Sequence, residues 1–201
     1  MAQTDPELAA AIARHGYVIG LAGWSGSGKT TLAEKIIAGL NLRGLDIATI
    51  KHAHHKFDAD TPGKDSFRHR QAGARQVVVA STSRSVIFSE NRPHSERSLA
   101  DLLTALNPAD IVLVEGFKRE AIPKIEIFRP DNASPALFPN DPMIIAVATD
   151  TPSSLTSDLA GTASNPDLPI LDLPILDLND AAAIVDFVCT LAGNNNMDGA
   201  S

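Results

Sequence analysis

The sequence has little cysteine and few aromatic residues: it contains one cysteine and one tryptophan, and 4% of its residues are aromatic. A single cysteine cannot form an internal disulfide, which suits a reducing compartment. Cys189 lies in the apolar run 181–192, where a buried thiol is favoured over a nucleophile. No apolar run reaches the ~20 residues of a membrane span, and the N-terminal residues do not resemble a secretion signal. We therefore expect a cytoplasmic protein without a membrane partner.

The sequence also lacks a surplus of positive charge. Lysine and arginine number 17 against 24 acidic residues, which gives a formal net charge of -7. A general nucleic-acid binder needs a basic surface, so we expect no nucleic-acid partner, and any site for a polyanion must be local. The 201 residues are 44% hydrophobic and 20% charged, as in ordinary globular domains. A chain of this length can bury a core without disulfides or structural metals.

Apolar runs of strand length alternate with helical patterns along the chain. This alternation predicts an α/β fold with a mostly parallel twisted sheet, helices on both faces and some antiparallel or edge strands. The predicted strands are 17–22, 46–50, 76–80, 85–88, 111–114, 124–128 and 143–148, and the predicted helices are 6–13, 30–42, 95–106 and 181–191. We expect an N-terminal helical extension over 1–15, one domain over 16–192 and a disordered tail over 193–201.

Several of these elements carry finer predictions. The wholly apolar run 111–114 indicates a central strand, whereas the alternating run 124–128 indicates a more exposed one. Ser95 is the expected N-cap of the helix 95–106, and Asn179 or Asp180 that of the last helix. The repeat PILDL, at 169–173 and 174–178, contains prolines that exclude a central strand, so an edge segment or connector is expected.

The strongest signal lies where the first strand meets its helix. The segment Gly23–Thr30 reads GWSGSGKT and fits the P-loop pattern GxxxxGK[ST] completely. Its glycines allow successive backbone N–H groups to point at phosphate oxygens, and the following helix adds positive potential. Lys29 is expected to bridge the β- and γ-phosphates, and the Thr30 hydroxyl to bind Mg²⁺. The motif predicts a P-loop NTPase fold that holds a nucleoside triphosphate.

A carboxylate on a neighbouring strand completes such a site. Glu115 ends the apolar run 111–114 and is our candidate, either as a direct ligand of Mg²⁺ or through a bound water. An aspartate is commoner at this point, and a solvent-facing acid at a strand end is the alternative. We therefore expect Lys29 and Glu115 among the catalytic groups, with Thr30 and Glu115 at the metal.

A second polar stretch, 51–75, follows the second strand, where loops line the ligand crevice of such folds. It contains Asp60-Thr61-Pro62-Gly63, a DxxG string in which the acid would reach Mg²⁺ and the Gly63 N–H the γ-phosphate. Asp60 is accordingly a catalytic and metal candidate. Further on, Lys64, Arg68 and Arg70 share a predicted helical segment with His69. They could bind the outer phosphates or a second anion, or form a solvated basic face.

Two other readings of this stretch stay open. His52, His54 and His55 could hold a transition metal, as in a metallochaperone-like GTPase, but hydrogen bonding to phosphate or to an acidic neighbour is favoured. A small-molecule kinase would use the same loop with a catalytic base, for which Asp58 or Asp65 could serve. Metal binding by the histidines would support the first alternative, and phosphate transfer to a metabolite the second.

Three segments together resemble the molybdopterin-guanine dinucleotide biosynthesis protein B family. They are GWSGSGKTTL, KHAHHKFDADTPGKDSFRHRQAGA and ADIVLVEGFKREAIPKIEIFR, and the resemblance runs in order from Val18 to about Arg129, with 143–150 fitting a later strand. It implies a homodimer that binds GTP with Mg²⁺ and hydrolyses it slowly. It also implies an accessory role beside the guanylyltransferase that joins GMP to molybdopterin. Molybdopterin itself and molybdoenzyme maturation proteins are further candidate partners.

The resemblance carries over to individual residues. It makes Gly23–Thr31 the phosphate loop, Asp60 and Gly63 the switch-like pair, and Glu115–Lys118 the later motif. The nucleotide contacts expected in that loop are Gly23, Trp24, Ser25, Gly26, Ser27, Gly28, Lys29, Thr30 and Thr31. No NKxD string follows a strand, so guanine specificity is implied by the family alone. Asp150 could accept hydrogen bonds from guanine N1 and N2, or could be a turn or cap residue.

The expected activity is therefore that of an accessory protein: slow GTP hydrolysis that a partner or a dimer contact changes, since no arginine finger is evident in the sequence. A pure adaptor that binds GTP or the cofactor without turnover is a variant of this reading. If molybdopterin binds, its phosphate is expected at Lys64–Arg70, because arginine offers paired donors to phosphate.

Overall fold

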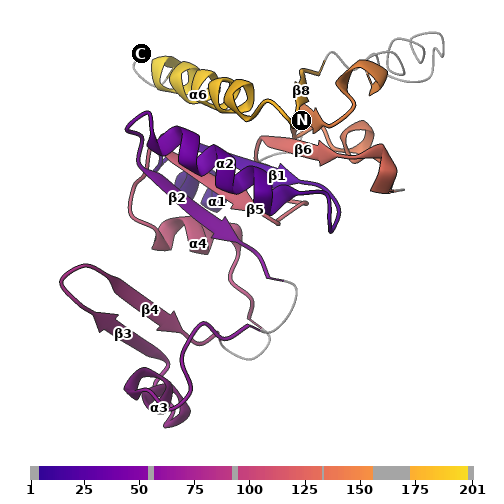
Figure 1. The fold of residues 1–201 in the computed structure, drawn as a ribbon. Coiled ribbons are helices and arrows are strands. Elements are labelled where there is room, and N and C mark those ends of the chain that lie inside the picture. The colour runs from indigo at the N-terminus through magenta and orange to yellow at the C-terminus, as the bar shows by residue number, and fades with distance from the viewer. Residues whose placement is uncertain (1–4, 54–56, 92–94, 133, 156–172, 199–201) are drawn as a thin grey trace. The chain divides into compact units, whose positions relative to one another are not determined.

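The computed structural model describes residues 5–53, 57–91, 95–132, 134–155 and 173–198 (Figure 1). The elements in chain order are α1 (Pro6–Ile12), β1 (Tyr17–Ala22), α2 (Lys29–Asn41), β2 (Ile47–Lys51), α3 (Asp65–Gln71), β3 (Gln76–Ala80), β4 (Ser85–Ser89), α4 (Leu99–Ala105), β5 (Ile111–Glu115), β6 (Lys124–Phe128), η1 (Pro130–Asn132), η2 (Phe138–Asn140), β7 (Ile144–Thr149), β8 (Ile175–Asp177) and α6 (Ala181–Asp198). All seven predicted strands are present, and their bounds differ from the predicted ones by at most one residue.

Six strands form one sheet in the order β2-β5-β1-β6-β7-β8, and each neighbouring pair is parallel. Strands β3 and β4 pair with each other as an antiparallel hairpin. Parallel strands need crossover connections, which the intervening helices supply. The predicted α/β class, with a mostly parallel sheet and a small antiparallel part, is confirmed.

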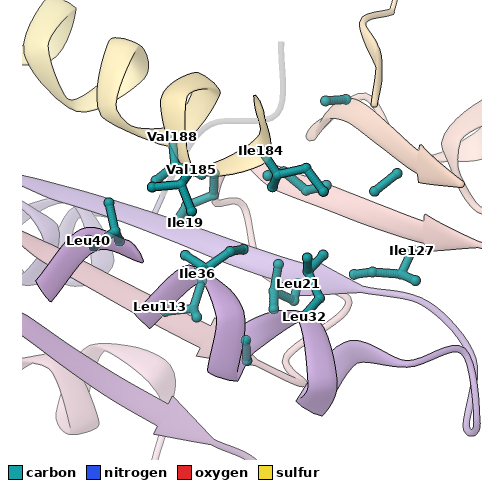
Figure 2. Close-up of a cluster of buried hydrophobic side chains, with 14 of the residues drawn as sticks. Ile19, Leu21, Leu32, Ile36, Leu40, Leu113, Ile127, Ile184, Val185 and Val188 are labelled. Carbon is teal, nitrogen blue, oxygen red and sulfur yellow. The ribbon is translucent and has the colours of Figure 1, made fainter. Parts of the chain in front are cut away.

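One face of the sheet is covered by α2 and α6, as Figures 1 and 2 show. Leu32, Ile36 and Leu40 recur at helical spacing on α2 and are all buried. Figure 2 shows these side chains meeting Ile19 and Leu21 of β1, which places the largest apolar cluster directly behind the loop that joins β1 to α2. That packing fixes the start of α2 relative to the end of β1.

The opposite face is covered by α1 and α4. Leu8 and Ala11 of α1 and Leu99 and Leu103 of α4 pack against strand residues such as Val112. The N-terminal helix is therefore packed into the core. With α2 and α6 on the other face, helices cover both faces of the sheet, as the alternating pattern predicts. Among the described helices, none combines the length and hydrophobicity that a membrane crossing requires.

The contacts of the chain divide it into two compact units, a division that the sequence analysis does not foresee. The first unit comprises residues 1–52 and 99–201 and contains the six-stranded sheet. The second comprises residues 53–98 and contains α3 and the β3–β4 hairpin.

Two helix boundaries differ from the predictions by more than one residue. The helix expected over 95–106 begins at Leu99, so Ser95 lies outside it and is not its N-cap. Residues 95–98 bury no apolar side chain, whereas Leu99 and Leu103 provide the i, i+4 pair that packs on the sheet. The last helix continues to Asp198, so the tail expected to be disordered from residue 193 is helical through residue 198.

The edge position of β8 and the N-cap of α6 agree with the predictions. The second PILDL copy contains β8, which lies at the edge of the sheet, as its prolines predict. Most of the first copy, and the string Asn165–Asp167, lie outside the described residues. Asp180 accepts a hydrogen bond from the Ala183 N–H at 2.9 Å and so caps α6.

The prediction that Lys124–Phe128 is a more exposed strand is wrong. This strand is β6, which lies between β1 and β7, and Lys124 and Glu126 are 1% and 0% exposed. Buried charges require partners. The Lys124 ammonium pairs with the Asp141 carboxylate at 2.9 Å and donates to the carbonyl oxygens of Lys118 and Glu120.

Glu126, two residues along the same face of β6, is also fully partnered. Its two carboxylate oxygens accept hydrogen bonds from the Leu137 and Phe138 N–H groups at 2.8 and 2.7 Å. Burial raises the pKa of Glu126, and these two hydrogen bonds oppose the rise. The alternation of polar and apolar residues in β6 is therefore produced by two buried charges that hold adjacent loops.

Candidate functional site

A glycine-rich loop, residues 23–28, joins β1 to α2, which is the strand-loop-helix context that the motif requires. Gly23 has a φ angle of +139° and Gly28 one of +99°, values that favour glycine. A Cβ atom on Gly23 would also lie 2.6 Å from the carbonyl oxygen of Ile127 in β6. Backbone conformation and close packing therefore both require glycine where the loop leaves the sheet.

The first turn of α2 leaves its backbone N–H groups open. Gly28 is the N-cap residue and has no side chain that could cap these groups. The first four N–H groups of a helix have no partner within the helix, and the helix dipole adds partial positive charge there. Ser27 is buried, whereas Ser25, Gly26, Thr30 and Thr31 are exposed. A glycine-rich loop before an uncapped helix is an arrangement that can bind an anion.

Lys29 lies over this loop. Its ammonium donates a hydrogen bond to the Trp24 carbonyl oxygen at 2.7 Å, so the side chain folds back across the loop. Burial lowers the pKa of Lys29, the charges of Lys118 and Lys51 lower it further, and the Glu115 carboxylate opposes them. A bound anion would relieve the repulsion among these three ammonium groups.

Three polar groups meet beside the loop: Thr30 of α2, Lys51 at the end of β2 and Glu115 at the end of β5. The Thr30 hydroxyl donates to the Glu115 carboxylate, with distances of 3.1 and 3.4 Å to its two oxygens. The Lys51 ammonium lies 3.2 Å from the Thr30 hydroxyl and 3.2 Å from the nearer Glu115 oxygen. Thr30 and Glu115 are thus adjacent, as the motif predicts. A hydroxyl and a carboxylate are oxygen donors of the kind that Mg²⁺ accepts, so these residues fit that ion.

The Trp24 side chain of this loop contacts Lys118. The Trp24 Nε1–H donates to the Pro135 carbonyl oxygen at 2.7 Å, and the Lys118 ammonium lies 4.5 Å from the centre of the indole ring. This distance is within the range of a cation–π interaction. The indole is 38% exposed. The one tryptophan of the chain therefore lies in the candidate site, where its fluorescence can report on a ligand.

Arg129 connects the loop to Asp150. Its Nε donates to the Ser27 carbonyl oxygen at 3.0 Å, and its Nη1 pairs with the Asp150 carboxylate at 3.0 Å. Asp150 follows β7 at the carboxyl end of the sheet, as predicted. The sequence analysis gives Arg129 no role. The available signal is its position directly after β6, because residues at the carboxyl ends of parallel strands meet at one edge.

The loop after β5 has a strained backbone that packs on His52. Gly116 and Phe117 have φ angles of +101° and +47°, and the Phe117 and His52 rings lie 4.9 Å apart. A Cβ atom on Gly116 would lie 2.6 Å from the His52 Cβ. His52 thus packs against the loop that follows Glu115. His54 and His55 lie outside the described residues, and in the described part of the chain no three potential metal-binding side chains form a group.

Asp60 belongs to the second unit, where its carboxylate is fully engaged. It accepts hydrogen bonds from the Ser66 hydroxyl at 2.8 Å, the Thr61 N–H at 2.9 Å and the Arg70 guanidinium at 2.9 Å. Although burial opposes the change, these hydrogen bonds lower the pKa of Asp60. Gly63 follows with a φ angle of +84°, so the DxxG string forms a turn that is stabilised within its own unit.

Arg70 is the centre of this network. Its guanidinium also pairs with Asp58 at 2.9 Å and Glu90 at 2.7 Å, and its side chain is 13% exposed. The hydrogen bond from Arg70 lowers the pKa of Asp58, and the carboxylates raise the pKa of Arg70. Arg70 therefore binds carboxylates of its own unit. The sequence analysis instead considers it as a residue that binds the outer phosphates or a second anion.

The other basic residues of this unit are more open. Lys64 is exposed and immediately precedes α3, whereas Arg68 makes a 3.8 Å contact with the Asp65 carboxylate and is 74% exposed. The predicted helix is thus confirmed for Arg68, His69 and Arg70, whereas Lys64 is its N-cap residue and lies outside it. Lys64 and Arg68 stay candidates for binding an anion, and Asp58 and Asp65, considered as kinase bases, both contact arginines.

A family model described as molybdopterin guanine dinucleotide synthesis protein B matches residues 18–150. A molybdopterin-guanine dinucleotide biosynthesis adapter protein of Escherichia coli (strain K12) is 41% identical over 175 residues, which cover 85% of this chain and 90% of that protein. The adapter protein of the same name from Haemophilus influenzae is 39% identical over 172 residues and covers 85% and 86%, respectively. The match therefore includes the glycine-rich loop, Glu115 and Asp150.

Solved structures show the same fold. The crystal structure of a MobB protein homolog from Bacillus stearothermophilus aligns with a TM-score of 0.58 and 25% identity, over 88% of this chain and 98% of that one. The Bacillus subtilis MobB structure aligns with a TM-score of 0.59 and 24% identity, over 87% and 96%. The arrangement of sheet and helices is thus shared with these proteins along almost their whole length.

Proposed function

Because the chain belongs to the molybdopterin guanine dinucleotide synthesis protein B family, we propose that it binds GTP with Mg²⁺ at residues 23–31 and assists the guanylylation of molybdopterin. The observation that carries the proposal is the uncapped start of α2 behind the glycine-rich loop, with Lys29 above it and Thr30 beside Glu115. This combination supplies N–H donors, positive charge and oxygen ligands at one edge of the sheet.

Each group then has a separate task in nucleotide binding. The N–H groups of the loop and of the first α2 turn bind phosphate oxygens, and Lys29 exchanges its contact with the Trp24 carbonyl for the outer phosphates. Thr30 and Glu115 hold Mg²⁺, either directly or through water. When bound, that ion neutralises charge that develops between the phosphates. Asp60, the switch-like candidate, lies in the second unit.

The relatives that resemble this chain over most of their length are named adapter proteins, which supports an accessory role. We propose that the partner is the guanylyltransferase that joins GMP to molybdopterin, and that the chain works as a cytoplasmic homodimer with slow GTP hydrolysis of its own. Molybdopterin or a molybdoenzyme maturation protein would then be further partners. Lys64 and Arg68, exposed and basic, are the proposed contacts for a pterin phosphate.

Titration of the purified chain with GTP and ATP, with and without Mg²⁺, tests this function. Calorimetry gives the affinity, Trp24 fluorescence reports occupancy of the loop, and phosphate release gives the turnover. We expect a preference for GTP, slow turnover, and at least about tenfold weaker binding by Lys29→Ala, because Lys29 contacts the phosphates. Lys35→Ala, an exposed lysine on the same helix, is the matched control. A preference for ATP with phosphate transfer to a metabolite would favour a kinase.

A further inference from the structure

Lys51 is the first residue of the second family segment, but neither the motif nor the resemblance gives it a role. It ends β2, and the sheet register places it directly opposite Glu115 of β5. Its ammonium lies 3.2 Å from both the Thr30 hydroxyl and the Glu115 carboxylate, which are themselves 3.1 Å apart. The positive charge therefore contacts both of the oxygen groups proposed to hold Mg²⁺.

The chemistry of Lys51 allows it to replace a cation reversibly. A lysine ammonium is a compact charge with three donors on a flexible four-carbon stem. The Lys51 side chain is 58% exposed, whereas that of Glu115 is 16% exposed. Lys51 can therefore leave toward solvent or toward a phosphate, while Glu115 stays in place. A partly buried carboxylate that loses the ammonium needs another cation.

We propose that Lys51 is an internal substitute for Mg²⁺: its ammonium holds Thr30 and Glu115 together without the metal and is displaced when Mg²⁺ binds with the nucleotide. This inference rests on the proposed function, because it concerns the same nucleotide site. Lys51 and Mg²⁺ compete for the same two oxygens. Lys51 also supplies part of the positive charge that a metal-free triphosphate needs, so it reduces the dependence of GTP binding on Mg²⁺.

Lys51 thus changes the thermodynamic coupling between the binding of GTP and the binding of Mg²⁺. The ratio of the GTP dissociation constant without Mg²⁺ to that with Mg²⁺ measures how strongly the metal assists binding. Replacing Lys51 by Met frees Glu115 for the metal and removes an ammonium from the metal-free complex. Both changes raise the ratio, and we expect an increase of at least about fivefold, at the lower end of usual coupling between ligands.

The experiment is calorimetric titration of GTP into wild type, Lys51→Met and Lys51→Arg, each with Mg²⁺ and with EDTA, after circular dichroism has shown that each variant is folded. Lys51→Arg keeps the charge and should keep the wild-type ratio. Lys35→Met, on the exposed side of α2, is the control for the loss of a lysine elsewhere. If Lys51→Met does not fold, Lys51→Gln replaces it in the same comparison.

The outcomes separate the inference from the proposed function. A raised ratio in Lys51→Met, with wild-type ratios in Lys51→Arg and Lys35→Met, supports the substitute role. An equal weakening with and without Mg²⁺ leaves the ratio unchanged and overturns it, because a merely structural residue would act in that way. A lowered ratio overturns it too. If wild type with Mg²⁺ binds no GTP, the proposed function fails, and this inference fails with it.

Discussion

Asp150 is the residue that the sequence offers for base recognition, with a turn or cap role as the alternative. Its carboxylate lies at the carboxyl end of β7 and is joined through Arg129 to the backbone of Ser27. A carboxylate can accept hydrogen bonds from both N1 and N2 of guanine, whereas adenine presents no such pair of donors. The link through Arg129 would hold this acceptor at a fixed distance from the phosphates.

We predict that Asp150→Asn weakens GTP binding by about tenfold to a hundredfold, because hydrogen bonds to a charged group contribute about 1.5–3 kcal/mol. Calorimetry with GTP, ATP and xanthosine triphosphate measures the change. ATP affinity should stay constant, and xanthosine triphosphate should gain affinity, because the amide can donate to the oxygen at C2 of xanthine. Asp131→Asn, an exposed aspartate in η1, is the matched control. An equal loss for all three nucleotides would instead indicate damage to the Arg129 link.

At the residue scale, the sequence identifies the groups whose spacing is local. Gly23, Lys29 and Thr30 lie within one motif, and the spacing alone predicts their roles. Lys51 and Arg129 are different, because their partners come from distant strands. The order β2-β5-β1-β6-β7 sets Lys51 beside Glu115 and Arg129 beside Ser27. A single sequence does not contain that order, so it shows that both residues lie at strand ends but does not identify their partners.

At the scale of elements, hydrophobic pattern predicts where strands occur but not which are central. The wholly apolar run 111–114 is buried in β5, as expected. The pattern misleads in β6, because Lys124 and Glu126 are buried with partners from the loops 117–122 and 135–141. Removing one partner of a buried ion pair costs about 3–5 kcal/mol, so such charges persist only with complete partners. The periodicity of a strand shows which of its residues are polar. It contains no information about the loops that supply the partners of those residues.

The Arg70 network gives the second unit a predictable dependence on pH. In the folded state the hydrogen bond from Arg70 lowers the pKa of Asp58, and hydrogen bonds from Ser66 and Arg70 lower the pKa of Asp60 although burial opposes the change. Acids with lowered folded pKa values stabilise the fold fully above the unfolded value, about 4, and lose that stabilisation as the pH falls through the lower folded value. We therefore predict that residues 57–91 lose protection against amide hydrogen exchange below about pH 4. Hydrogen exchange with mass spectrometry between pH 2.5 and 7 measures this change.

Two variants test the cause of that dependence. Arg70→Met leaves three carboxylates without their cation, so residues 57–91 should exchange faster at pH 7 and gain protection as the acids are protonated. The pH slope thus reverses in sign relative to wild type. Arg84→Met, an exposed arginine at the hairpin turn, should behave as wild type. A pH slope that Arg70→Met leaves unchanged would show that other groups control the stability of this unit.

At the scale of the whole molecule, the described part of the second unit buries few apolar side chains. Among its described residues, Val77 is the one buried apolar side chain. On one face of its hairpin Val78 and Ile87 lie directly opposite each other and are 64% and 66% exposed. Small units with so little buried surface usually gain stability by association. The proposed homodimer offers such a partner, because a second copy presents the same apolar pair.

We predict that the double variant Val78→Thr/Ile87→Thr weakens the homodimer. Burial of a Val or Ile contributes about 1.5–3 kcal/mol, so loss of both in each copy should raise the dimer dissociation constant at least about a hundredfold. Threonine favours strands, so the hairpin should stay folded. Sedimentation equilibrium over a range of protein concentrations measures the constant, and circular dichroism checks the fold.

The opposite face of the same hairpin supplies the control. Val79 and Val86 are also paired across the strands, and they are 47% and 39% exposed. Val79→Thr/Val86→Thr removes a similar apolar pair from the other face, so it should leave the dissociation constant within about threefold of wild type if the Val78–Ile87 face forms the contact. Equal weakening by both variants would argue for general destabilisation of the hairpin. A wild-type chain that sediments as a monomer would remove the homodimer from the proposed function while leaving the nucleotide site intact, because Lys29, Thr30 and Glu115 all come from one chain.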